Sequence, residues 1–199
     1  MASYVPQDPE FEARVRGSFA SQTLMRTVGA RLLRVSPGEV EIGFRFRDDL
    51  TQHHGFLAGA VVTAIVDVAC GYAAMTLMPP GASVLTIEYK VNFLSPAQGE
   101  RVIARGRVVR PGRAVTVCAG DVVALHTGRE KTIATMLATM ATVNSDGAEF
   151  ARTEAGAASA DDRRRGSHPR RASRPARPWC VCRGQGLGRR LRSIVRSAL

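Results

Sequence analysis

A single carboxylate, Asp67, lies in the middle of a long apolar segment that runs from Ala60 to Met78. No other residue of this segment carries a charge, which predicts a helix that is buried on nearly every side. Burial removes the hydration of a carboxylate and raises its pKa toward the range of a general base. Asp67 is therefore a candidate catalytic base, and the alternative is a structural carboxylate that is hydrogen-bonded to a neighbouring strand.

The same apolar segment is long enough to cross a bilayer, since a span needs about 20 apolar residues. Asp67 at its centre argues against a membrane span, because a charge is costly at that depth. The first residues show neither the basic start nor the apolar stretch of a signal peptide. We therefore expect a cytoplasmic protein without a membrane partner.

The net charge of +11 is concentrated toward the C-terminal end. Residues 1–150 contain 15 Lys and Arg against 14 Asp and Glu, whereas residues 151–199 contain 13 Arg against 3 acids. The first part thus lacks the basic excess of a nucleic-acid-binding domain. Cys70 and Cys118 lie in apolar segments and are expected in the core, and the CxC pair near the C-terminus is weak support for a metal site.

The elements that would position Asp67 follow from the patterns around it. Asp8 and the apolar spacing after it predict a helix over residues 8–27, with Asp8 as its N-cap. Strands are predicted over 29–35 and 39–46, on either side of a Ser-Pro-Gly turn. After the apolar helix, turn residues separate four further predicted strands, at 83–94, 100–110, 113–126 and 129–143.

This order of elements predicts an α+β domain over residues 1–145, with one antiparallel sheet packed on a long helix. A flat sheet covers only one side of a helix, so the sheet is expected to curl around it. Strict alternation over 83–94 would place Thr86 and Glu88 together on the polar face of their strand.

Four stretches resemble the hotdog-fold thioesterases, specifically the PaaI-like (phenylacetyl-CoA) acyl-CoA thioesterases. They are Gln-His-His-Gly-Phe-Leu at 52–57, Ile-Val-Asp-Val-Ala-Cys-Gly-Tyr-Ala-Ala at 65–74, Val-Asn-Phe-Leu-Ser-Pro-Ala with Gly-Glu over 91–100, and Arg-Pro-Gly-Arg at 110–113. The close resemblance spans residues 50–143. It implies a hotdog fold, hydrolysis of aryl- or fatty-acyl-CoA to the free acid and CoA, and no metal or redox cofactor.

The resemblance also implies roles for individual residues. Asp67 matches the helix carboxylate that acts as general base or nucleophile, and Gln52 matches an Asn or Gln near the attacking water or the thioester. Gly59 matches the glycine whose N–H polarises the thioester carbonyl. Thr86 matches a Ser or Thr on the third strand.

One position departs from the family pattern. Many members carry a His directly before the glycine that Gly59 matches, and here the residue is Ala58. His54 on the preceding loop is a candidate substitute for the missing imidazole. The departure also keeps open an alternative function, a non-catalytic hotdog protein that binds acyl-CoA or acts as a scaffold.

The spacing between Gly59 and Asp67 has a geometric consequence. Eight residues of helix are about 12 Å long, so one carbonyl group cannot contact both residues of the same chain. An active enzyme would therefore take Gly59 from one subunit and Asp67 from another. We expect a homodimer, with a dimer of dimers as a plausible assembly.

The acyl and CoA parts of the substrate need different surroundings. Candidate residues around the acyl group are Phe56, Leu57 and Tyr72, and Gly55 is a further candidate for binding the substrate. Candidates for the CoA phosphates are Arg110 and Arg113, with Arg101, Arg105 and Arg107 as alternatives.

Residues 146–199 are rich in Arg, Ala, Gly, Ser and Pro and are expected to be a disordered tail. One interpretation is a basic segment that binds nucleic acid. The other is a segment without selected function, since Arg without Lys is what an altered reading frame in a GC-rich gene would produce.

Overall fold

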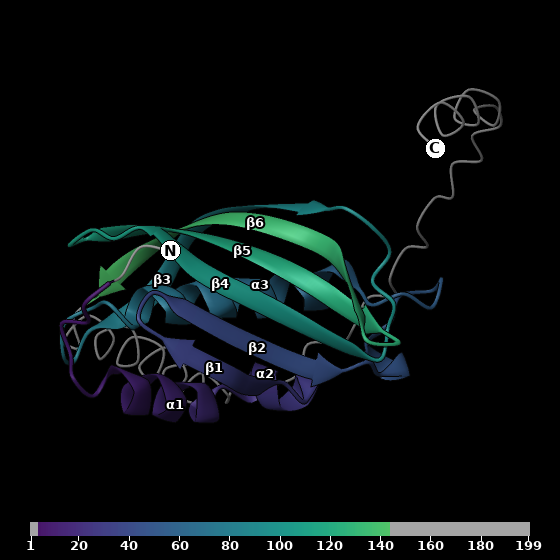
Figure 1. Cartoon of the computed structure of the whole chain (residues 1–199), viewed down its shortest axis with the longest axis horizontal. Coiled ribbons are helices and arrows are strands. Elements are labelled where there is room, and N and C mark those ends of the chain that lie inside the picture. Colours follow the sequence, from purple (N-terminus) through teal and green to yellow (C-terminus); the bar gives the residue numbers. More distant parts are fainter. Residues whose placement is uncertain (1–3, 144–199) are drawn as a thin grey trace, which may run out of the picture. The chain divides into compact units, whose positions relative to one another are not determined.

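The computed structural model describes residues 4–143, which form a six-stranded antiparallel sheet packed on a long helix (Figure 1). The helices are α1 (Phe11–Ser21), α2 (Thr23–Val28) and α3 (Gly59–Met75), with a short 3-10 helix at Asp48–Leu50. The strands are β1 (Arg31–Ser36), β2 (Glu39–Arg45), β3 (Ser83–Phe93), β4 (Arg101–Arg110), β5 (Val115–His126) and β6 (Arg129–Val143). They are ordered β1-β2-β4-β5-β6-β3, which confirms the predicted α+β hotdog architecture.

Helix α3 packs on strands β2 to β6 and forms the centre of the core. Two glycines that face each other on β4 and β5, Gly106 and Gly120, allow this close approach. A Cβ atom at Gly106 would collide with the backbone of Ala69, and one at Gly120 would lie 2.8 Å from the Cys70 sulfur. Within residues 4–143 no helix, α3 included, is both long and apolar enough to cross a membrane.

The predicted single helix over 8–27 is two helices in the structure. Gln22 between them has extended backbone angles (φ −74°, ψ 109°), which ends α1 and starts α2 in a new direction. Asp8 precedes α1 by three residues, and its carboxylate accepts the N–H of Glu10 at 2.9 Å. Asp8 therefore orders the turn before the helix instead of capping its first residue.

Arg14 of α1 ties this helix to the end of α3. Its guanidinium donates to four backbone carbonyl oxygens, those of Met75, Met78, Pro79 and Ala82. Its Nε atom lies 3.1 Å from the buried carboxylate of Asp8. Met75 is the last residue of α3 and the other three carbonyls lie in the segment after it, so Arg14 holds α1 against this end of α3 through charge-assisted hydrogen bonds.

Replacing Arg14 by alanine is expected to lower the free energy of unfolding by at least about 2 kcal/mol, because carbonyl oxygens and Asp8 lose a charged partner. Denaturant unfolding at fixed protein concentration measures the loss. Arg16→Ala is the matched control, since Arg16 makes an exposed ion pair with Glu12 that is worth less than about 0.5 kcal/mol. Equal losses in both variants would contradict this role of Arg14.

The strands that follow α3 lie where the sequence predicts them, within two residues at each end. The interpretations of residues 146–199 concern a segment outside the described residues.

Candidate active site

Asp67 lies halfway along α3 with a half-buried carboxylate. Loss of hydration raises the pKa of this carboxyl above its ordinary value. The Thr86 hydroxyl donates a hydrogen bond of 2.8 Å to Asp67 Oδ1, which acts in the opposite direction and lowers that pKa. A bond to a neighbouring strand is also what a structural role predicts, so this bond alone does not separate the two interpretations.

A bulge in β3 is what turns Thr86 toward Asp67. Thr86 and Glu88 oppose consecutive residues of β6, so Ile87 between them has no partner. Thr86 therefore faces α3, while Glu88 lies on the other face of the sheet and accepts a hydrogen bond from Thr139. The uninterrupted alternation predicted for 83–94, with Thr86 and Glu88 on one face, is wrong.

Asp67 and Thr86 open into a small cavity of about 170 Å³. It is lined by Ser18, Gln22, Asp67, Val68, Gly71, Tyr72, Met75, Ser83, Val84 and Thr86. The buried Tyr72 hydroxyl accepts a hydrogen bond of 3.0 Å from Gln22 and lies 3.1 Å from the Ser18 hydroxyl. Burial raises the pKa of Tyr72. A carboxylate beside polar groups and open space is suited to act on a ligand.

Ser18 and Gln22 were missed by the sequence analysis. They are more than 40 positions away from Asp67 in the chain, and no local spacing connects them to it. The break between α1 and α2 at Gln22 brings both side chains to the Tyr72 hydroxyl.

Gly59, the first residue of α3, lines a second cavity of about 410 Å³. It is formed by Gln52, Phe56, Leu57, Gly59, Val62, Phe93, Leu94, Ser95, Pro96, Ala97 and Ile133. Gly59 is exposed, and its N–H makes no hydrogen bond to any of residues 4–143. The Phe93 ring covers it so closely that an added Cβ would lie 3.1 Å from the ring. A free N–H at the positive end of a helix is suited to bind an anionic oxygen.

The loop before α3 folds back on itself at Gly55, whose φ of 80° favours glycine. The Gln52 side-chain oxygen accepts the N–H of His54, and the Gln52 N–H donates to Phe56 at 2.8 Å. His53 and His54 are exposed, with ring centres 3.9 Å apart. Neither histidine lines the Asp67 cavity or the Gly59 cavity.

One chain thus holds the candidate residues in two separate groups. The Asp67 cavity contains Asp67, Tyr72 and Thr86, and the Gly59 cavity contains Gln52, Phe56, Leu57 and Gly59. No residue lines both cavities. The predicted acyl-binding residues are divided in the same way, with Tyr72 apart from Phe56 and Leu57. Gly55, Arg110 and Arg113 line neither cavity.

Comparison with known proteins places this arrangement in a family. A model of the thioesterase superfamily matches residues 54–131. The crystal structure of a thioesterase family protein from Silicibacter pomeroyi is 48% identical in sequence and superposes with a TM-score of 0.67, covering 67% of this chain and 98% of that one. The chain belongs to the thioesterase superfamily.

Two further proteins are also similar to this chain. A Halobacterium salinarum protein named as a proposed esterase is 32% identical over 105 residues, which are 50% of this chain and 69% of that protein. The PaaI protein of the E. coli phenylacetic acid degradation operon is 14% identical, has a TM-score of 0.63, and matches 69% of this chain and 96% of its own. At that identity PaaI shows the fold alone. The predicted resemblance to hotdog thioesterases of the PaaI group is confirmed.

Two of the arginines considered for CoA in this thioesterase-superfamily chain have other partners. Arg105 lies 2.7 Å from Glu130, and Arg107 lies 3.0 Å from Asp121. Arg110 and Arg113 flank the exposed turn between β4 and β5. Residues 4–143 hold no group of three or more His, Cys, Asp or Glu that is placed to bind a metal ion.

Proposed function

We propose that this chain is an acyl-CoA thioesterase that hydrolyses aryl- or fatty-acyl-CoA and is active as a homodimer. The observation that carries the proposal is the placement of two complementary groups on α3. Asp67 supplies a half-buried carboxylate with a raised pKa, and Gly59 supplies an N–H at the helix start that bonds to none of residues 4–143. Each lies beside its own cavity, in a chain of the thioesterase superfamily.

These two groups meet the needs of thioester hydrolysis. The Gly59 N–H stabilises the negative charge that develops on the carbonyl oxygen. Asp67 takes a proton from water as the water oxygen bonds to the carbonyl carbon, and the C–S bond then breaks to release CoA, whose sulfur takes the proton. In the other route open to it, Asp67 attacks the carbonyl carbon itself and the C–S bond breaks, so that CoA leaves as a thiolate that takes a proton from solvent. Water then hydrolyses the resulting anhydride, which releases the acid and restores the Asp67 carboxylate.

The edge strand β3 supports a dimer. Among the strands of residues 4–143 it pairs with β6 alone, and several of its exposed side chains are large and apolar. More than half of the surface of Leu85, Ile87, Phe93 and the following Leu94 is exposed. An unprotected apolar edge is a template for pairing with another strand, and a two-fold axis pairs β3 with β3 of a second copy in antiparallel fashion.

Antiparallel pairing of two β3 strands would also complete the site. One end of β3 carries Thr86, whose hydroxyl is hydrogen-bonded to Asp67. The other end carries Phe93, whose ring packs over Gly59. Reversing the strand direction puts the Phe93 end of one subunit next to the Thr86 end of the other. The Gly59 cavity of each subunit would then adjoin the Asp67 cavity of its partner, and two such dimers could associate further.

Release of free CoA from a panel of aryl- and fatty-acyl-CoAs by the full chain tests the proposal and ranks the acyl groups. The alternative is an acyl-CoA-binding or scaffold protein without hydrolysis, favoured by Ala58, which offers no side-chain hydrogen bond at the start of α3. Thioester binding without CoA release would establish that alternative, and Ala58→His would show whether the missing imidazole is the cause.

Replacing Thr86 by valine is expected to shift the acidic limb of the pH–rate profile upward. The Thr86 bond lowers the pKa of Asp67, so its loss raises that pKa further. The ionised form is the active one, so activity is present above the pKa and is lost as the pH falls through it. Plots of kcat/KM against pH measure the shift. Thr86→Ser keeps the hydroxyl and should retain the parent profile, and identical profiles for valine and serine would contradict this role of Thr86.

A further inference from the structure

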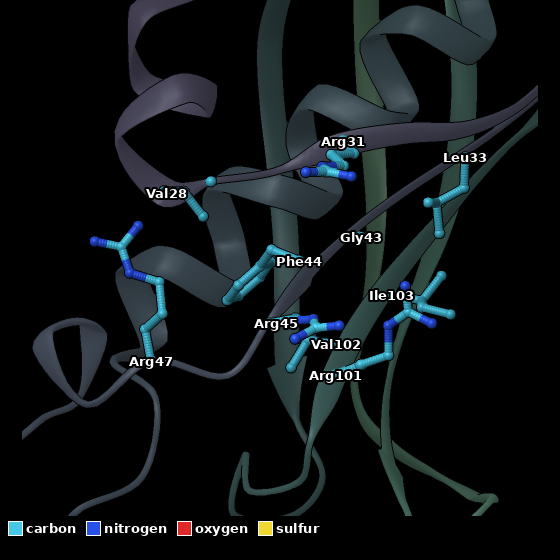
Figure 2. A pocket seen from close by; sticks show the side chains of 11 residues that line it. Val28, Arg31, Leu33, Gly43, Phe44, Arg45, Arg47, Arg101, Val102 and Ile103 are labelled. Atoms are coloured by element: carbon cyan, nitrogen blue, oxygen red, sulfur yellow. The ribbon is translucent and has the colours of Figure 1, made fainter.

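A third cavity lies near the free edge strand β1, away from both groups of candidate catalytic residues. It measures about 370 Å³ and is bordered by β1, β2, β4 and the end of α2 (Figure 2). Its lining consists of Val28, Gly29, Arg31, Leu33, Gly43, Phe44, Arg45, Arg47, Arg101, Val102 and Ile103. Four of these residues are arginines, and none is acidic.

Three of the arginines lie on the face of the sheet that points away from α3, called the outer face below. Buried neighbours such as Ile42 face the helix, so Gly43 and Arg45 face outward by alternation. Arg31 pairs with Gly43 across β1 and β2, and Arg45 pairs directly with Arg101 across β2 and β4. Figure 2 shows these three arginines around Gly43.

The Arg45–Arg101 pair is unfavourable by itself, because like charges directly opposite each other destabilise a sheet. No carboxylate among residues 4–143 forms an ion pair with Arg31, Arg45 or Arg101. The fourth arginine, Arg47, is paired with Asp49 at 2.6 Å.

Elsewhere on the outer face, arginines are matched with acids. Arg34 is paired with Glu39 and Glu41, Arg105 with Glu41 and Glu130, and Arg107 with Asp121. Arg31, Arg45 and Arg101 thus differ from these three arginines, each of which has an acidic partner. No acidic side chain of the described residues relieves the repulsion between Arg45 and Arg101. An anion bound in the cavity would offset it.

The shape of the cavity supports a ligand of some size. Gly43 contributes no side chain, and a Cβ there would lie 2.8 Å from Leu33 Cδ1 and 3.1 Å from the Val102 carbonyl oxygen. Leu33 and Ile103 thus pack closely over Gly43 and supply the apolar part of the cavity lining, whereas the arginines supply its charge. A volume of about 370 Å³ is in the range of small-molecule sites.

We propose that Arg31, Arg45 and Arg101 bind a phosphate-bearing anion in this cavity. Three guanidinium groups without acids match the multiple charge and the several oxygen acceptors of phosphate better than the single charge of a carboxylate. The phosphate could belong to a free phosphorylated compound or to the CoA portion of a thioester. The proposal does not depend on thioester hydrolysis.

Arginine modification by phenylglyoxal, mapped by mass spectrometry on the full chain, tests the proposal site by site. Inorganic pyrophosphate or CoA is added as the probe, and Arg31, Arg45 and Arg101 should be protected more strongly than Arg129, an exposed arginine outside the cavity. Protection by pyrophosphate would show that phosphate groups suffice, and protection by CoA alone would identify CoA as the source. Protection by neither, or protection no stronger than that of Arg129, would overturn the proposal.

A pair of variants separates binding from folding. Arg101→Gln is expected to weaken pyrophosphate binding at least about tenfold, because hydrogen bonds between charged groups are lost. Without the ligand it should leave thermal stability unchanged or raised, because it removes the repulsion from Arg45. Arg129→Gln should still be stabilised by pyrophosphate as the parent is. If pyrophosphate stabilised Arg101→Gln and Arg129→Gln equally, the anion would bind outside this cavity, and residues 144–199 would be one candidate location.

Discussion

Replacing Asp67 by asparagine is expected to lower the rate of thioester hydrolysis at least about a hundredfold, the low end for the loss of general-base catalysis. Asparagine has nearly the same shape and can still accept the Thr86 hydrogen bond, but it can neither take a proton from water nor attack the carbonyl carbon. Steady-state release of CoA from the best acyl-CoA of the panel measures the loss. A fall of less than about tenfold would exclude Asp67 as base or nucleophile.

The same substitution should not harm folding. Burial raises the pKa of Asp67 in the folded chain, so the ionised carboxylate is less favourable there than in the unfolded chain. This cost is present in full above the folded pKa, shrinks as the pH falls below it, and is gone below the unfolded pKa. A neutral asparagine side chain avoids the cost, so thermal unfolding of Asp67→Asn at pH 7 should show equal or higher stability. Asp49→Asn is the matched control, since its carboxylate is exposed and should not affect hydrolysis.

The sequence contained enough information to predict the architecture, but not to predict the face of the sheet on which every strand residue lies. The strands and α3 were predictable because apolar periodicity and turn residues bound each of them. The bulge at Ile87 was not, since nothing in an alternating strand marks the residue that will be left unpaired. It changes the face on which Thr86 lies, so the contact with Asp67 became visible only in the structure.

Only part of the candidate site could likewise be inferred from the sequence. Asp67 became a candidate because a lone carboxylate in an apolar helix is a local feature of the chain, and Gly59 became one through the resemblance of its stretch to the family. Ser18, Gln22 and the arginine-lined cavity depend on contacts between distant segments and on strand register. Arg45 and Arg101 become neighbours only when β2 pairs with β4, so their like charges gave no signal in the linear sequence.

Replacing Gly59 by proline is expected to lower hydrolysis about a hundred- to a thousandfold, the range for losing one oxyanion donor. Proline removes the N–H yet suits the first position of a helix, and Ala58 already has the extended conformation (φ −61°, ψ 135°) that a following proline requires. Gly59→Ala is the control, because it adds the same Cβ against Phe93 and keeps the N–H. If alanine and proline reduce kcat equally, crowding against Phe93 is the cause and the N–H has no role.

Combining the two inactive subunits tests whether each site is shared between chains. In a heterodimer of Asp67→Asn and Gly59→Pro subunits, one site joins both defects, and the other joins the intact Gly59 of the first subunit to the intact Asp67 of the second. Such heterodimers, isolated through two different affinity tags, should recover about half of the parent activity, since an isologous dimer has two equivalent sites. If Gly59 and Asp67 of the same chain formed the site, both sites would be defective and the heterodimer would stay as inactive as its parents. Recovery would therefore show that the active site is shared between subunits, which agrees with the separate cavities that hold the two residues in a single chain.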